Sequence, residues 1–125
     1  MKTIISLLAA VALLARCATP DVTPSLTSQS AKLRVEVCSR GCYQYVLALP
    51  TTAADSVLYP INLTEAMQKQ AFDYGATNRD GLPVLFSGEL LADKTQISHP
   101  GPTDVPMDAY KARNVRLTSI MVQLK

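Results

Sequence analysis

The sequence has a single histidine, His99, in 125 residues, and this scarcity argues against hydrolytic and metal chemistry. A Ser-His-Asp triad would depend on His99, and the neighbouring Ser98 is too close along the chain to serve as its nucleophile. A zinc site built from Cys38, Cys42 and His99 would lack a fourth ligand. A glycine-rich loop of the kind that holds phosphates is also missing. We therefore expect a protein that is not an enzyme and has no metal site and no cofactor.

The sequence also lacks an apolar run long enough to cross a bilayer comfortably. An apolar stretch extends from Ile4 to Leu14 after a lone Lys2, and its length is that of the hydrophobic region of a signal peptide. We therefore predict that the chain is exported and that residues 1–17 form a signal peptide.

A surplus of positive charge is missing from the expected mature chain. Of twelve basic residues, Lys2 and Arg16 lie in the leader, which leaves ten against ten acidic residues. Nucleic-acid binding draws on a surplus of lysine and arginine that faces the phosphates. No nucleic-acid partner is therefore expected.

The residues before Cys17 resemble the lipobox of bacterial lipoproteins. Leu14 and Ala15 fit the pattern, whereas Arg16 stands where glycine or alanine is expected. The resemblance implies that Cys17 is acylated and becomes the new N-terminus. Because each buried CH₂ of an acyl chain contributes about 0.8 kcal/mol, several chains give stable anchoring. We expect a membrane anchor at Cys17, at the outer membrane or on the periplasmic face; the alternative is a periplasmic or secreted soluble protein.

Residues 18–30 are rich in threonine, serine and proline and nearly uncharged, so they cannot bury much apolar surface. This composition predicts a flexible tether. The remaining residues, 31–125, have the length of one small domain.

The start of this domain predicts a β-hairpin. Residues 32–39 alternate apolar and polar side chains, which is typical of a half-buried strand, and residues 42–49 are rich in strand formers. The residues between them fit a three-residue loop in which Gly41 takes a left-handed conformation. Cys38 and Cys42 then face each other across the hairpin, and export to an oxidising compartment favours a disulfide between them.

Further elements are expected as strands over residues 57–63, 82–91 and 114–125 and a helix from about residue 64 to Gly75. Asn62 or Thr64 can cap the helix. Its apolar stripe consists of Leu63, Met67, Ala71 and Tyr74. Gly88 indicates a bulge or bend, and the apolar parity of the last strand switches near Ser119, which predicts another bulge.

Residues 92–109 are dominated by turn formers, with three prolines from Pro100 to Pro106. We predict a long, stiff loop here, with a brief strand at residues 95–98 as an option. Asp104 and Asp108 in this loop are expected to be solvated rather than to bind calcium.

Five strands with a helix between the third and the fourth is the layout of an OB-like Greek-key barrel. The predicted fold is therefore mainly β, and an open β-sandwich with one helix is the alternative. The bulges favour the barrel, because small barrels need them to close.

The stretches "LYPINL", "VLFSGELL" and "NVRLTSIMV" resemble those of a group of small exported lipoproteins of the Bacteroidota with OB-like domains. These stretches are structural motifs. The resemblance implies an exported accessory or binding protein and supplies no catalytic residues.

OB barrels commonly bind ligands on the face of the second and third strands and on adjoining loops. Here that surface would hold Arg40, Tyr43, Tyr45 and Tyr59 together with the loop over residues 92–109. Tyr43 and Tyr45 share a face with Leu47, so an alternative is that they belong to the core. Aromatic stacking together with arginine would suit a protein, peptide or glycan ligand.

Two functions remain open. The first is a non-enzymatic lipoprotein of the cell envelope that acts as a binding or accessory module. The alternative is an exported thiol-disulfide protein that uses Cys38 and Cys42. The alternative is disfavoured because a reactive thiolate usually lies at a helix N-terminus, with two residues between the cysteines rather than three.

Overall fold

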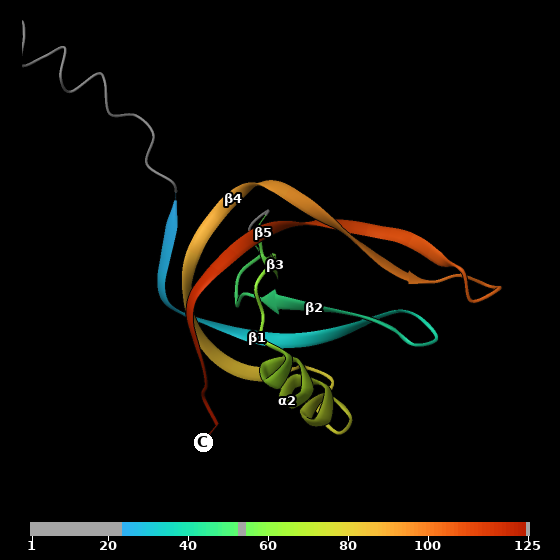
Figure 1. Cartoon of the computed structure of the whole chain (residues 1–125), viewed down its shortest axis with the longest axis horizontal. Helices are drawn as coiled ribbons and strands as arrows, with labels where there is room; N and C mark the ends of the chain where they lie inside the picture. The colour runs from blue at the N-terminus through green and yellow to red at the C-terminus, as the bar shows by residue number, and fades with distance from the viewer. Residues whose placement is uncertain (1–23, 53–54, 125) are drawn as a thin grey trace, which may run out of the picture.

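The computed structural model describes residues 24–52 and 55–124, and five strands of this part close into a barrel with a single helix (Figure 1). The elements are β1 (Ser25–Ser39), β2 (Cys42–Ala48), β3 (Val57–Pro60), α2 (Glu65–Gly75), β4 (Leu82–Pro100) and β5 (Pro106–Val122). The mainly β barrel predicted from the sequence is confirmed, and the open sandwich is wrong. The expected signal peptide and Cys17 lie outside the described residues. Within the described part, no helix has the length and apolar character that a bilayer-spanning segment needs.

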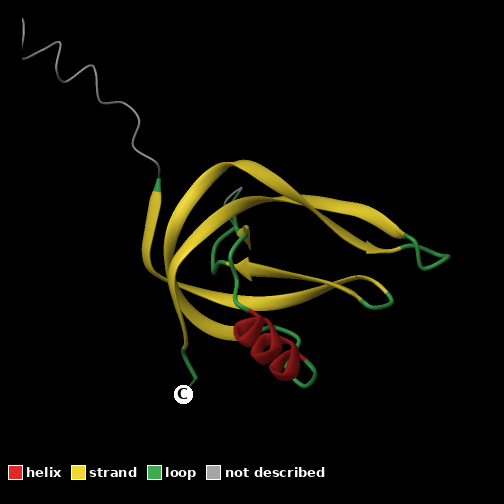
Figure 2. Ribbon diagram, in the orientation of Figure 1, coloured by secondary structure: helices red, strands yellow, loops and turns green. Residues whose placement is uncertain are grey.

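The strands follow one another around the barrel in the order β1-β2-β3-β5-β4, and β4 pairs with β1 to close it (Figure 2). Neighbouring strands are antiparallel except β3 and β5, which run parallel. Closure leaves the barrel without a free edge along its central part.

The tether was expected to extend to Ser30, but β1 begins at Ser25, so this boundary is corrected. Ser25 lies opposite Glu89 of β4, and Ser30 lies opposite Leu85. At an irregularity between these pairs, Ser28 has φ 47° and its N–H donates to Oγ of Ser87 at 2.9 Å. This polar segment has little apolar surface to bury. Its backbone pairing with β4 is what makes it a strand.

The long loop predicted over residues 92–109 is wrong. β4 and β5 continue as a hairpin from the pair Lys94–Arg113 to the pair Pro100–Pro106, and only residues 101–105 form the loop. Pro100 is the last residue of β4 and Pro106 is the first residue of β5. Both therefore lie beside the turn, where a missing N–H is tolerated. The last strand therefore begins at residue 106 and not at residue 114. We call residues 94–113 the hairpin arm.

The bulge expected near Ser119 is confirmed. Ser87 lies opposite Ser119, but Gly88 lies opposite Leu117, so Thr118 is the extra residue. A Cβ atom on Gly88 would lie 2.6 Å from the backbone oxygen of Arg116, so the glycine permits this close approach.

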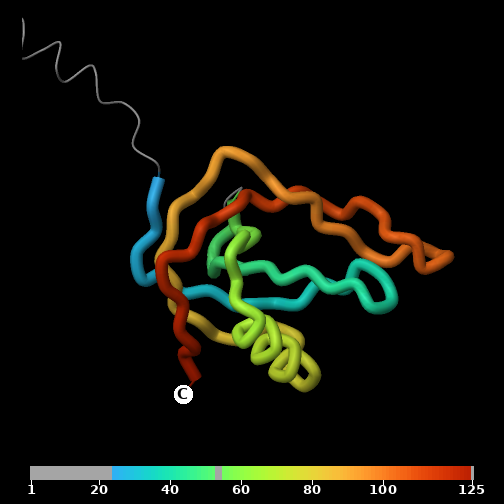
Figure 3. The backbone as a smooth tube through the Cα atoms, in the orientation of Figure 1, coloured from blue at the N-terminus to red at the C-terminus, as the bar shows by residue number. Residues whose placement is uncertain are grey.

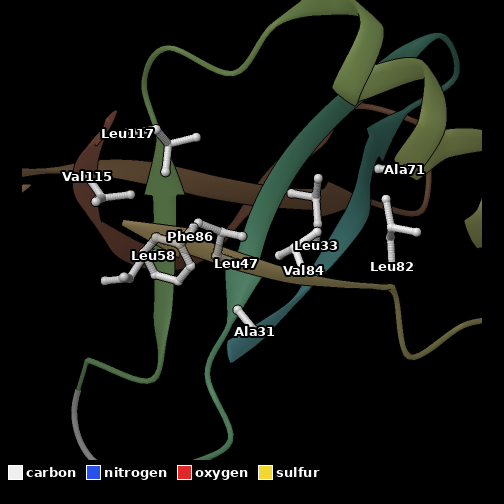
Figure 4. Packing of buried hydrophobic residues seen from close by; sticks show 10 residues of the cluster. All are labelled: Ala31, Leu33, Leu47, Leu58, Ala71, Leu82, Val84, Phe86, Val115 and Leu117. Carbon is white, nitrogen blue, oxygen red and sulfur yellow. The ribbon is translucent and has the colours of Figure 1, made fainter. Parts of the chain in front are cut away.

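The main core fills the barrel with side chains from every strand, and α2 covers it through Ala71 (Figure 4). Its buried members are Ala31, Leu33, Leu47, Leu58, Ala71, Leu82, Val84, Phe86, Val115 and Leu117. The helix begins after Thr64, whose side chain accepts a hydrogen bond from the N–H of Met67 at 3.3 Å. Asn62 precedes this cap and exchanges two hydrogen bonds with the backbone of Leu117, at 2.8 and 2.9 Å. These bonds fix the chain between β3 and α2 against β5.

A second apolar cluster lies on the opposite face of β2 and β3. Val46, which follows the strand alternation away from Leu47, packs with Ile97 and Ala112 of the hairpin arm, and all three are buried. Val57, Tyr59 and Tyr110 are partly buried against them. Both faces of β2 are therefore covered near Val46, and the arm runs on the same side of the barrel as the β1–β2 hairpin (Figure 3).

Candidate functional site

The β1–β2 hairpin ends in a turn clipped by a disulfide. The bond between Cys38 and Cys42, predicted from the sequence, is confirmed, with 5.2 Å between their Cα atoms. Gly41 has φ 76°, the left-handed conformation expected of it. The loop is one residue shorter than predicted, because Ser39 pairs with Cys42 and an irregularity after Val37 takes up the odd residue.

The tips of the two hairpins are joined. The backbone N–H of Arg40 donates to both carboxylate oxygens of Asp104, at 3.2 and 3.3 Å. Asp104, which has φ 63°, is exposed, as expected, and makes this contact in addition. The contact links residues 64 positions apart in the sequence, and only the folded barrel brings them together.

Behind the tips, polar side chains join the arm to the β1–β2 hairpin. The side-chain amide of Gln44 donates to the carbonyl oxygen of Gln96, and its oxygen accepts from the N–H of Ser98, both at 3.0 Å. Gln44 thus bonds to the backbone of β4 as a neighbouring strand would.

Tyr110 of the arm lies against β1. Burial, followed by the nearby charge of Glu36, raises the pKa of the Tyr110 hydroxyl, and the Arg34 side chain opposes that rise through its charge and its position within reach of the hydroxyl. Neither the hydroxyl oxygen of Tyr110 nor Nε of Arg34 has a hydrogen-bond partner among the described residues, although both atoms are buried. The guanidinium of Arg34 instead lies 3.6 Å from the carboxylate of Glu36.

The structure does not gather the four residues of the predicted binding face at one place. Tyr43 and Tyr45 lie on one face of β2, with Tyr45 partly buried against the main core. Burial raises the pKa of the Tyr45 hydroxyl, with a smaller contribution from Tyr43. Tyr59 belongs to the second cluster, on the other face of the β2–β3 sheet. Arg40 is exposed at the clipped turn.

Tyr43 instead meets a residue that sequence reasoning missed. Its ring lies edge-on to that of Phe72 of α2, with 5.0 Å between the ring centres and 76° between the planes. Val37 lies opposite Tyr43 in the hairpin, and together they border a hollow of about 260 Å³ beside the helix. We call Val37, Tyr43 and Phe72 the aromatic platform. Phe72 lies outside the apolar stripe of α2. A large apolar side chain on the polar side of a helix is the sequence feature that could have identified it as a surface contact.

The side chains of the aromatic platform remain open to solvent. Val37 is 47%, Tyr43 44% and Phe72 42% exposed. The disulfide, the β1–β2 pairing and α2 hold them in place from two directions. Such a surface can bind an apolar side chain or stack against a flat ligand.

The single histidine does not border the hollow beside the aromatic platform. His99, placed in β4 rather than in a loop, is exposed, and its Nδ1 lies 3.2 Å from the carbonyl oxygen of Pro100. The part of the chain that the structure describes contains no group of three or more His, Cys, Asp or Glu side chains arranged to hold a metal ion.

Comparison with models of known protein families, with curated proteins and with solved structures finds no match to this chain. The resemblance to Bacteroidota lipoproteins therefore stays a prediction, and the chemistry of the surface must carry the functional argument.

Proposed function

We propose that this protein is a non-catalytic binding module of the cell envelope, anchored by lipid on Cys17, that binds a protein or peptide partner through the aromatic platform. The observation that carries the proposal is the contiguity of three large apolar side chains, each more than two-fifths exposed, on a rigid hairpin and helix. Exposed apolar patches on small soluble domains commonly mark interaction sites.

The chemistry of the platform favours a partner that inserts an apolar side chain. Aromatic side chains dominate the energetic centres of protein interfaces, because they bury a large area at a low cost in conformational entropy. Asn78 and Arg79 line the hollow and add polar groups at the edge of this surface. A polar rim around an apolar centre is the usual anatomy of such an interface.

Two observations support the envelope address. The apolar leader before Cys17 has the length of a signal peptide. The Cys38–Cys42 disulfide suits the oxidising compartments that exported proteins reach.

A photo-crosslinking amino acid at position 43 tests the platform in cells. We expect one discrete crosslinked protein from position 43 and its loss in a Phe72→Ser variant. Met121, which is exposed on β5 outside the platform, provides the matched control position and should give no such product. Equal crosslinking from positions 43 and 121 would contradict the proposal. A crosslinked glycan in place of a protein would exclude the protein partner.

Labelled palmitate tests the anchor separately. We expect label in the wild-type chain and none in a Cys17→Ala variant. Label that persists in that variant would exclude Cys17 as the acylated residue.

The thiol-disulfide function is the alternative, and burial weighs against it. Cys38 is only 2% exposed, so the pair offers Cys42 alone for attack by a substrate thiolate. We expect no reduction of insulin disulfides by the protein, and activity that disappears in Cys38→Ser would establish the alternative instead.

A further inference from the structure

A second surface carries a different chemistry from the aromatic platform. A cleft of about 720 Å³ lies over the outer side of β1, between the end of α2 and the last described residues of the chain. An adjoining hollow of about 290 Å³ shares Lys32, Tyr74 and Asp80 with it. Small-molecule sites occupy roughly 300–1,000 Å³, so the cleft has the size of such a site.

Positive charge converges on this cleft and the adjoining hollow from two segments. Lys32 and Arg34 reach the cleft from β1, and Arg79 borders the adjoining hollow from the loop after α2. Within residues 24–52 and 55–124, Lys32 and Arg79 have no carboxylate close enough for an ion pair, whereas Arg34 lies near Glu36. Asp80 is the one acidic side chain in either lining, so positive charge is in excess.

The other wall of the cleft is apolar. Leu49 and Pro50 border it after β2, and Leu124 borders it at the end of the chain. Leu124 is 56% exposed and lies two residues beyond the end of β5. An aliphatic chain lying along this wall would remove these side chains from water.

We propose that the cleft binds a small amphiphilic anion, with its carboxylate or phosphate head at Lys32 and Arg79 and its aliphatic body against Leu49, Pro50 and Leu124. Tyr74 lines both the cleft and the adjoining hollow, and its hydroxyl supplies a neutral donor to the head. The two cations without an ion-pair partner suit an anionic head group, and the apolar wall suits an aliphatic chain. Only the two together indicate an amphiphilic ligand. The proposal goes beyond the platform and does not depend on it, although Arg79 borders both surfaces.

Binding can be measured from amide chemical-shift changes on the chain from residue 24 to residue 125. Suitable probes are octanoate, acetate, octan-1-ol, octyl phosphate and octyltrimethylammonium. The whole described barrel lies within this chain. We expect octanoate or octyl phosphate to bind with shifts around Lys32, Tyr74 and Leu124, and the tighter of the two identifies the head group. Octanol and the cationic probe should bind at least about fivefold more weakly, roughly what two exposed charge contacts provide. Acetate should also bind more weakly, because it lacks the aliphatic body that the apolar wall would cover.

Variants locate the two halves of the site. Exchange of both cations, Lys32→Gln with Arg79→Gln, should weaken octanoate binding about fivefold, and added salt should weaken the wild type in the same direction. Lys111→Gln removes an exposed charge on the hairpin arm outside the cleft and is the matched control. Leu124→Ser should weaken octanoate but leave the response to acetate unchanged.

Three results would overturn the inference. Octanol that binds as tightly as octanoate would show that charge plays no part. Unchanged binding in the Lys32 and Arg79 double variant would remove the head-group site. Shifts centred on Tyr43 and Phe72 would assign the ligand to the aromatic platform and leave the proposed function intact.

Discussion

Gln44 offers the sharpest test of how the hairpin arm is held. Its side chain makes two hydrogen bonds of 3.0 Å to the backbone of β4, one as donor and one as acceptor. Each such bond contributes about 0.5–1.5 kcal/mol net, so Gln44→Ala should lower the free energy of unfolding by about 1–3 kcal/mol. A value near 2 kcal/mol corresponds to a roughly 30-fold change in the folding equilibrium.

Urea unfolding gives this free energy, and amide hydrogen exchange localises the change. We expect faster exchange at the Ser98 N–H in the variant, because that group loses its acceptor. Gln29→Ala is the matched control, since the Gln29 amide bonds only to the carbonyl oxygen of the next residue. That control should stay within about 0.5 kcal/mol of the wild type.

A second variant tests the direction of the two bonds. Gln44→Glu keeps an acceptor for Ser98 but places a carboxylate against the carbonyl oxygen of Gln96. It should be at least as destabilising as Gln44→Ala at pH 7 and should recover when acid protonates the new side chain. The reasoning is refuted if Gln44→Ala matches the Gln29→Ala control, or if Gln44→Glu is as stable as the wild type at neutral pH.

Three further predictions concern the clip, the buried hydroxyl and the tight bulge. Reduction of the Cys38–Cys42 bond should lower the free energy of unfolding by at most about 2 kcal/mol, because the closed loop is so short; complete unfolding on reduction, seen by circular dichroism, would contradict this. Tyr110→Phe should leave stability equal or higher at pH 7, because the buried hydroxyl makes no well-aligned hydrogen bond with the described residues; a loss above about 1 kcal/mol in urea would mean that the neighbouring Arg34 satisfies it. Since its pKa is raised above the usual value of 10.0, the folded state keeps that proton longer than the unfolded state does. Stability should therefore be unaffected by this group below pH 10 and fall as the pH rises above it, with a smaller fall in Tyr110→Phe. Gly88→Ala should cost about 1–3 kcal/mol, because the added Cβ would lie 2.6 Å from a backbone oxygen. Gly75→Ala, where the nearest atom outside the helix is 4.0 Å away, is its control and should be neutral or slightly stabilising.

The elements that the sequence predicted correctly have signals that are local. The alternation over residues 32–39, the left-handed Gly41 and the capping Thr64 depend on residues a few positions apart, and the structure contains all three features. The pair Cys38–Cys42 also needed only the hairpin that these signals specify. The parity switch near Ser119 predicted the bulge, because side-chain alternation must break where a residue is inserted.

The hairpin arm escaped prediction because its stability is not local. Its residues are turn formers with little apolar patterning, and they form strands because β4 and β5 pair with each other and Ile97 is buried against Val46. β-propensity depends strongly on such cross-strand and same-face neighbours. Residues 25–30 were missed for the same reason, since only their pairing with β4 makes them a strand.

The sequence by itself determined a mainly β chain, its hairpin and clip, and the position of its helix, because turn geometry, capping and side-chain periodicity act within a few residues. Tertiary structure alone decided which side chains share a surface. Tyr59 lies in the second cluster, Phe72 contacts Tyr43, and Lys32 and Arg79 line one hollow. Such proximities follow from the order in which strands pair around the barrel, and that order is set by contacts between residues far apart in the chain.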